Sequence, residues 1–470
     1  MTNDQGQTIW LSALDQGKMI RDRAISPLEL TQLYLDRIDR LNPQLGSFFY
    51  IAAESAIADA KAKTEQITKI DDPSALPPFF GVPIAIKDLN AVTGMPHSFG
   101  LHIQKNNLAT YDDGVVARIK QAGFIILGKT ATSQIGSLPY TEPPGFPPAR
   151  NPWNLDYTPG GSSGGAAAAV AAGFCPVAQG SDGGGSLRGP AFCCGLVSIK
   201  PSRGRVSHAP VGDFQSGISV QGPLARNVRD AAALLDVMAG YITGDPYWLS
   251  DPPVSFLEAS EQKLSPLRIA FATEIPPVGA ADAVCQQGVQ DTAKRLENMG
   301  HHLEMACPDF SGLVQPFQRV WQGGVAAAGV PPEVLSPMNA WNLGQSGSAG
   351  EYLQAVMQMQ IISRQIVAFF DTYDALLLPT YIHPTIKIGE WADLAPQETL
   401  ERIVRWIAPC PPFNATGQPA IALPTGFDDQ GLPIGVQLIG KPADEATLIA
   451  LAAQLEAEIR FFEHKPGFGA

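Results

Sequence analysis

The sequence predicts an α/β fold: a central, mixed and twisted sheet covered by helices on both faces. Residues 82–86 form a short apolar run that is partly β-branched, which is typical of a buried strand. A helical segment at 115–122 and a second apolar strand at 124–127 follow it. The order strand, helix, strand favours a parallel sheet with helical crossovers. Near the end of the chain, strands at 420–424 and 434–439 form a pair joined by a Gly/Asp/Pro turn.

The first part of the chain, from about residue 8 to 66, is predicted to be helical. Ser26-Pro27-Leu28-Glu29 is a strong helix start, with Ser26 as the N-cap, Pro27 at the first helical position and Glu29 closing a capping box. Apolar residues then recur at helical spacing, and Asn42-Pro43 is expected to end this helix. Residues 139–161 form a long Pro/Gly/Asn loop, a length that is usually functional. A small-residue helix follows it at 164–172.

The second half alternates in the same way. Residues 241–265 are Pro-rich and polar and are interpreted as a linker, and 310–370 are mostly helical with a break at Pro331-Pro332. The remaining predicted elements are helices at 226–240, 280–299 and 445–458 and strands at 267–272 and 373–379.

Composition excludes several classes of protein. The 470 residues are 45% hydrophobic and 16% charged, which predicts a large buried core rather than disorder. The net charge of −13 and the absence of a Lys/Arg run disfavour a nucleic-acid partner. No Cys-x-x-Cys pair is present, so buried free thiols are favoured over a disulfide framework or a zinc site; the cysteines are 175, 193, 194, 285, 307 and 410.

Nothing in the sequence predicts a membrane partner. The first eight residues are polar and lack the apolar core of a signal peptide. The longest stretch of small apolar residues, 164–178, is shorter than a membrane span. We therefore expect a cytoplasmic protein.

Three residues predict chemistry: Lys87 at the end of an apolar strand, and Ser162 and Ser186 in Gly-rich loops. Amide hydrolysis needs a nucleophile, a base and donors for an oxyanion. Lysine acts as a base only when it is neutral, so it must be desolvated or lie near positive charge. The Ile-Ala-Ile run before Lys87 offers that setting. The alternative is an ordinary strand-end lysine that points into water.

The Gly-rich loops allow other interpretations. Gly183-Gly184-Gly185-Ser186 can place several backbone N–H groups beside a hydroxyl, but the loop can equally be a flexible turn or a phosphate cradle. The segment around Ser162 also fits Gly-x-Ser-x-Gly, the nucleophile elbow of α/β-hydrolases. That fold needs a strand before the serine and a histidine after it, and His383 is the one histidine in a plausible position.

Taken together, these segments resemble the amidase signature family over nearly the whole chain. The matching segments are 81–88, 151–155, 158–165, 184–191, 194–196, 200–201, 414–420 and 431–437. The Ser-Asp-Gly-Gly-Gly-Ser loop and the Cys193-Cys194 pair look more like the branch of cyclic aminohexanoate dimer hydrolases than the glutaminase component of the glutaminyl-tRNA amidotransferase. The resemblance implies one amidase domain over 1–470: N-terminal helices (1–70), a signature core (80–205), a variable substrate-side region (241–370), and C-terminal strands and a helix (371–470).

The resemblance also implies roles. Ser186 would be the nucleophile that forms an acyl-enzyme, Ser162, in a cis peptide, the proton relay, and Lys87 the general base. Backbone N–H groups of Gly183, Gly184, Gly185 and Ser186 would form the oxyanion hole. Ser163 is a plausible supporting hydroxyl or simply a solvated loop serine, and Asp182 and Arg188 are expected to pair and hold the loop. Gly183 departs from the Thr, Ile or Gln that is usual in the family, which suggests a more mobile loop.

We therefore expect an amidase that uses a small-molecule amide and no metal or organic cofactor, with a homodimer as the assembly to consider. The alternatives are the glutaminase subunit of an amidotransferase and a non-catalytic member of the fold. Substrate contacts are expected from 135–150 and 310–360, where apolar side chains favour hydrophobic amides unless they are simply core; those side chains are Trp321, Trp341, Met357 and Met359.

Overall fold

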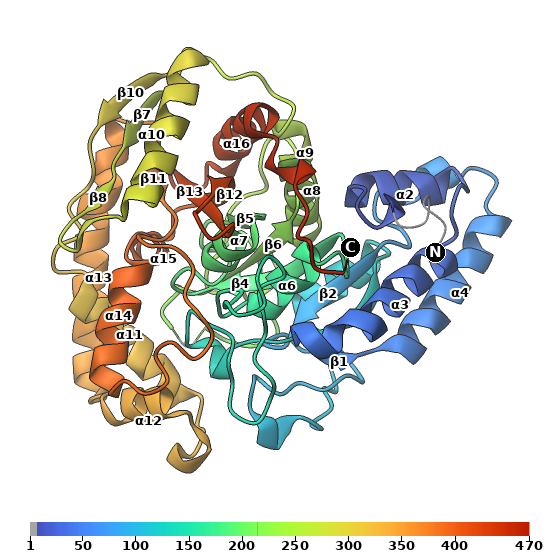
Figure 1. Cartoon of the computed structure of the whole chain (residues 1–470), viewed down its shortest axis with the longest axis horizontal. Coiled ribbons are helices and arrows are strands. Elements are labelled where there is room, and N and C mark those ends of the chain that lie inside the picture. The colour runs from blue at the N-terminus through green and yellow to red at the C-terminus, as the bar shows by residue number, and fades with distance from the viewer. Residues whose placement is uncertain (1–6, 214, 470) are drawn as a thin grey trace.

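The structure is a computed structural model that describes residues 7–213 and 215–469 (Figure 1). Most of the polar N-terminal stretch, residues 1–6, lies outside the described residues. Eleven strands of the described chain form one mixed sheet in the order β1-β3-β2-β4-β6-β5-β12-β13-β11-β7-β10. Helices cover both of its faces, so the predicted fold class is confirmed. Across the described residues, no helix combines the length and apolarity needed to cross a membrane.

The sheet is parallel at its two ends and antiparallel in the middle. β2 runs parallel to both of its neighbours, β3 and β4, and β7 runs parallel to β11 and β10. The strands are β1 (Phe48–Ile51), β2 (Pro83–Lys87), β3 (Ile125–Thr130), β4 (Val177–Asp182), β5 (Val197–Lys200), β6 (Val220–Ala225), β7 (Arg268–Phe271), β10 (His302–Met305), β11 (Ala375–Pro379), β12 (Ala420–Phe427) and β13 (Pro433–Gly440), with β8 (Glu274–Ile275) and β9 (Gly279–Ala280) as a separate hairpin.

Two helical layers enclose the sheet. On one face α5, α8, α16 and α10 pack side by side, and α6 and α7 pack on the other. At the N-terminal end α3 and α4 lie next to each other (Figure 1). The helices are α2 (Ala13–Arg21), α3 (Pro27–Leu45), α4 (Ala53–Lys69), α5 (Gly114–Gln121), α6 (Gly164–Ala171), α7 (Arg188–Cys194), α8 (Val228–Met238), α9 (Phe256–Ala259), α10 (Ala283–Asn298), α11 (Val314–Ala327), α12 (Pro337–Gly344), α13 (Ala349–Ala368), α14 (Pro396–Ile407), α15 (Pro411–Ala415) and α16 (Glu445–Ile459).

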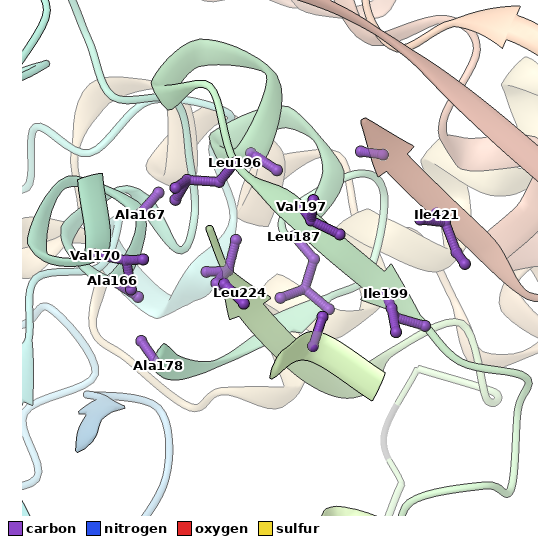
Figure 2. Packing of buried hydrophobic residues seen from close by; sticks show 14 of the residues in the cluster. Ala166, Ala167, Val170, Ala178, Leu187, Leu196, Val197, Ile199, Leu224 and Ile421 are labelled. Atoms are coloured by element: carbon purple, nitrogen blue, oxygen red, sulfur yellow. The ribbon is translucent and has the colours of Figure 1, made fainter. Parts of the chain in front are cut away.

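Small residues let α6 lie unusually close to the sheet. A Cβ on Gly165 would lie 2.4 Å from the backbone N and 2.5 Å from the backbone O of Ala131, so only glycine fits there. Ala166, Ala167 and Val170 continue this contact over Ala178 and its neighbours (Figure 2). The close approach matters because the N-terminus of α6 carries Ser162 and Ser163.

Several sequence-based boundaries were wrong. Residues 8–66 are not all helical, because β1 lies between α3 and α4 and pairs with β3. The capping box at Ser26 is present, but α3 continues through Pro43 to Leu45 and ends at Gly46, which has a φ of 64°. Pro43 lies in the last turn, where a missing N–H disturbs the fewest helical hydrogen bonds. The interpreted linker at 241–265 contains the short helix α9.

Central strands β4, β5 and β6 were not predicted from the sequence. β4 ends in Gln-Gly-Ser-Asp, which has the composition of a turn although the strand is almost wholly buried. β6 contains Pro223, and proline normally argues against a central strand. The β5–β6 ladder reaches only Leu224 and Ala225, so Pro223 lies where β6 pairs with β4 alone and needs no N–H toward β5.

Candidate active site

Lys87 is the last residue of β2, and its side chain is wholly buried. β2 and β4 are parallel neighbours, so their carboxyl ends, Lys87 and Asp182, meet at the same edge of the sheet. The Lys87 backbone N–H donates to Gln179 Oε1 over 3.1 Å, which fixes the strand end. The lysine is therefore not the solvated strand-end residue that the sequence allowed.

The Lys87 amine lies among three serine hydroxyls. Its Nζ is 2.8 Å from Ser162 Oγ, 2.8 Å from Ser163 Oγ and 3.0 Å from Ser181 Oγ. Ser162 and Ser163 come from the loop that leads into α6, and the peptide bond between Gly161 and Ser162 is cis. Ser181, on β4, received no role in the sequence analysis, although it lies within the Gly-rich motif.

Ser186 lies on the loop that joins β4 to α7. The next residue, Leu187, packs onto Gly180 and Gly222, which are paired across β4 and β6; a Cβ on either glycine would lie 2.8 Å from a Leu187 methyl carbon. The loop can thus come down onto the sheet (Figure 2). The Ser163 N–H donates to the Ser186 carbonyl over 3.3 Å, which joins the loop to the Ser162–Ser163 segment.

Asp182 organises the nucleophile loop from within. Its carboxylate accepts hydrogen bonds from the backbone N–H groups of Gly185 (2.7 Å) and Leu187 (3.1 Å). It also pairs with the Arg188 guanidinium, with 3.0 Å separating Asp182 Oδ2 from Nε and Oδ1 from Nη2. Both side chains are wholly buried, so the pair acts as an internal brace for the loop.

Two residues that the sequence analysis missed complete this brace. Asn414 donates to Asp182 Oδ1 over 2.9 Å and accepts from Arg188 Nη2 over 2.6 Å. Gln437 accepts from Arg188 Nη1 over 3.0 Å. Both lie within matched C-terminal motifs, which was the available signal, but only the adjacency of β5, β12 and β13 brings them beside the loop.

The loop presents unequal backbone donors. Gly185, with a φ of 124°, already donates its N–H to Asp182. Among the described residues, none accepts from the N–H of Gly183, Gly184 or Ser186. Gly184, Gly185 and Ser186 line a cavity, so free N–H groups lie beside the exposed hydroxyl. This differs from the four equivalent donors that the resemblance implied.

Electrostatics favour a neutral Lys87. Burial lowers its pKa from 10.5 to about 7, and the nearby Asp182 charge opposes this only in part. Burial alone would raise the pKa of Asp182, but the Arg188 guanidinium outweighs it and holds that pKa well below its usual range. Arg188 balances the Asp182 charge within the brace, and Lys87 forms no ion pair of its own among the described residues.

The nucleophile-elbow interpretation of Ser162 finds no support. The segment before it is a loop rather than a strand, and the Ser162 hydroxyl contacts Lys87. His383 stacks on Trp406 with ring centroids 5.5 Å apart, and its Nδ1 lies 2.9 Å from the Pro384 carbonyl. Among the described residues, no group of three or more His, Cys, Asp or Glu side chains is arranged to hold a metal ion. All six cysteines are free.

Ser186 faces an apolar cavity, while Lys87 and Ser162 lie behind it. The described lining includes no Asp, Glu, Lys, Arg or His. Of the four apolar residues named from the sequence, only Trp321 lines the cavity. Met359 is buried in the core, Met357 is largely exposed on α13, and Trp341 packs beside the core. The predicted segments are represented by residues 137–139 and by Phe310, Leu313, Val314, Phe317, Gln318, Trp321, Met338 and Asn342.

Two further segments line the cavity and were not predicted. One is the β8–β9 hairpin, through residues 275–278. The other is α14, whose apolar residues follow an i, i+3, i+4, i+7 pattern; these are Leu400, Ile403, Val404 and Ile407. That spacing was readable in the sequence as an amphipathic helix.

Comparison with known proteins places the chain. The profile of the family described as Amidase matches residues 29–449. The chain belongs to the amidase signature family. A putative amidase of Synechocystis sp. is 58% identical over 450 residues, covering 96% of this chain and 89% of the relative. The glutaminase component of the glutamyl-tRNA(Gln) amidotransferase of Prochlorococcus marinus is 34% identical over 478 residues, covering 94% and 96%.

A solved structure of 6-aminohexanoate cyclic dimer hydrolase in complex with its substrate has the same fold as this amidase. The TM-score is 0.91 at 30% identity, and the match covers 98% of this chain and 99% of that one. The family and these neighbours establish that this amidase is an enzyme that hydrolyses amide bonds.

Proposed function

We propose that the enzyme hydrolyses neutral, apolar carboxylic amides through a Lys87–Ser162–Ser186 relay, with an acyl-enzyme on Ser186. The observation that carries the proposal is the wholly buried Lys87 amine, 2.8 Å from Ser162 Oγ and without an ion-pair partner among the described residues. Burial that lowers the pKa of Lys87 to about 7 makes the neutral, basic form accessible near neutral pH.

The hydrogen bonds around Lys87 orient its lone pair. The Ser163 hydroxyl donates to the Ser181 carbonyl over 3.1 Å, so toward Lys87 it must accept. A neutral amine has two N–H groups and one lone pair. If the N–H groups go to Ser163 and Ser181, the lone pair faces the Ser162 hydroxyl. Ser162 then donates its proton to Lys87 and can accept one from Ser186, which is the order that the relay requires.

Acylation follows from this arrangement. As Ser186 Oγ bonds to the amide carbon, its proton passes to Ser162 and the Ser162 proton passes to Lys87. The carbonyl electron pair moves to the oxygen, which the free N–H groups of Gly183, Gly184 and Ser186 stabilise. When the C–N bond breaks, the Lys87 ammonium returns a proton through Ser162 to the leaving nitrogen. The product amine departs and the acyl group stays on Ser186.

Deacylation repeats the same proton path. Water attacks the ester carbon while its proton passes through Ser162 to Lys87. The bond to Ser186 Oγ then breaks, Ser186 regains a proton through Ser162, and the carboxylic acid leaves. Serine–lysine relays are a known variant of serine catalysis that needs no histidine.

The cavity favours a free-standing amidase over a glutaminase. Similarity to the amidotransferase component keeps glutamine hydrolysis as the second candidate. Glutamine carries an ammonium and a carboxylate, and burying either without a partner is costly. The described lining of the cavity offers neither of them a counter-charge, so neutral amides fit better.

The test compares glutamine with neutral 4-nitroanilides in the wild type and in Ser186→Ala. We expect turnover of the anilides, none of glutamine, and a loss of several orders of magnitude in Ser186→Ala. Ser181→Ala is a matched control, because it removes a hydroxyl near Lys87 but not the nucleophile. Equal rates in the wild type and Ser186→Ala would contradict the mechanism, and release of ammonia from glutamine would favour the second candidate.

A further inference from the structure

Gly183 lacks a side chain for reasons of space rather than backbone conformation. Gly185, two residues later, needs glycine for its φ of 124°, whereas Gly183 is not among the residues with positive φ. A Cβ on Gly183 would lie 3.2 Å from Trp321 Cζ3 and 3.5 Å from Cη2. The same ring would lie 3.6 Å from a Cβ on Gly184. The indole of Trp321 therefore rests on the bare backbone of the nucleophile loop.

The far side of α11 holds this indole in place. A Cβ on Gly323 would lie 2.6 Å from the Tyr352 ring, and one on Gly324 would lie 2.4 Å from Gln215 Nε2. These two glycines let α11 pack tightly against α13 and the segment near Gln215. The Tyr352 hydroxyl pairs with Ser216 Oγ over 2.8 Å, which ties α13 to the same segment. α11 is thus fixed, and Trp321 points to the loop.

Phe317 extends the indole into an aromatic wall. It lies one helical turn before Trp321, and the two rings are nearly parallel, with an interplanar angle of 18° and centroids 6.2 Å apart. Both rings line the cavity together with Gly184 and Ser186. Trp321 is only partly buried, so the ring keeps surface toward the cavity. A flat apolar surface therefore stands beside the nucleophile.

We propose that Trp321 is the specificity-determining residue of this site and that it selects neutral amides with a planar, aromatic acyl group. The proposal rests on the proposed function, because the acyl group is taken to be held on Ser186. Aromatic rings gain more from stacking on a ring than saturated rings of similar size do. The expected preference for an aromatic over a saturated acyl ring is about two- to tenfold, the range typical of aromatic pairs.

Paired substrates test this selection. Benzoyl and cyclohexanecarbonyl 4-nitroanilide share a leaving group and differ mainly in the planarity of the acyl ring. We expect the wild type to favour the benzoyl compound in kcat/KM, Trp321→Leu to bring the ratio close to one, and Trp321→Phe to retain part of the preference. Met357→Leu, an exposed change on α13 outside the cavity, should leave the ratio unchanged. A ratio that Trp321→Leu does not alter would overturn the proposal.

The contact between Gly183 and Trp321 gives a second test. Gly183→Thr should displace the indole and lower both kcat/KM and the benzoyl preference. In the double variant Gly183→Thr/Trp321→Ala the threonine has room, so kcat/KM should recover relative to Gly183→Thr alone. Purely additive losses would show that the indole does not rest on the loop and would overturn the proposal.

Binding separates this inference from the proposed function. Benzamide and cyclohexanecarboxamide can be titrated calorimetrically into Ser186→Ala, with and without Trp321→Leu, without any turnover. Tighter binding of benzamide that disappears with Trp321→Leu supports the role of Trp321 even if Ser186 proves not to be the nucleophile. Equal affinities for the two amides would overturn it even if Ser186 is the nucleophile.

Discussion

The acid limb of the pH–rate profile should report the titration of Lys87. Burial lowers the pKa of this lysine from 10.5 to about 7, and the relay requires the neutral amine. With that pKa, the neutral fraction is about 90% at pH 8, about half at pH 7 and about 1% at pH 5. Because the active form is the deprotonated one, kcat/KM should rise with pH and level off near pH 8. Between pH 8 and pH 5 it should fall about 90-fold.

The assay is the initial rate of 4-nitroanilide hydrolysis at low substrate concentration, between pH 5 and 9. The released 4-nitroaniline is uncharged throughout this range, so its absorbance reports turnover alone. Lys87→Arg is the matched control, because a guanidinium keeps its proton at every pH used and should be inactive throughout. A wild-type rate that stays flat from pH 8 to pH 5, or a Lys87→Arg variant that retains activity, would refute the assignment of Lys87 as base.

The remaining predictions concern the groups that support the relay. Arg188→Met leaves the Asp182 carboxylate buried without its partner, so urea unfolding should show a loss of about 3–5 kcal/mol, and a loss below about 1 kcal/mol would contradict the brace. Ser163→Ala removes an acceptor from Lys87, and one such bond, worth about 1–3 kcal/mol, should lower kcat at least about fivefold with little change in KM. Gly189→Ala would place a Cβ 1.7 Å from the Tyr381 hydroxyl, and the overpacking should lower the thermal midpoint by several degrees, whereas an unchanged midpoint would mean that the ring is free to move.

Local patterns in the sequence predicted those parts of the structure that local chemistry determines. The capping box at Ser26, the buried strand that ends in Lys87 and the helix after Ser163 all carry their signals within a few residues. β4 and β6 escaped because burial outweighed unfavourable composition. A Gln-Gly-Ser-Asp run and a proline become strand only when neighbouring strands complete their hydrogen bonds.

The candidate site divides in the same way. Lys87, Ser162 and Ser186 lie in motifs that can be recognised along the chain. Asn414 lies 232 residues from Asp182, and only the sheet order makes them neighbours. Trp321 was named as an apolar residue near the substrate, but its place on Gly183 depends on how α11 packs against α13. The mobility expected for Gly183 stays a prediction, although the loop is more closely packed than a glycine run suggests.

The central claim is that Ser186 carries the acyl group. A slowly hydrolysed activated ester, 4-nitrophenyl benzoate, can be mixed with the enzyme, quenched in acid and analysed by intact-mass and peptide mass spectrometry. We predict one benzoyl group per chain, located on Ser186 and absent from Ser186→Ala. A benzoyl group on Ser162 or Lys87 instead, or turnover without any covalent adduct under conditions that trap one on a known serine amidase, would contradict the claim.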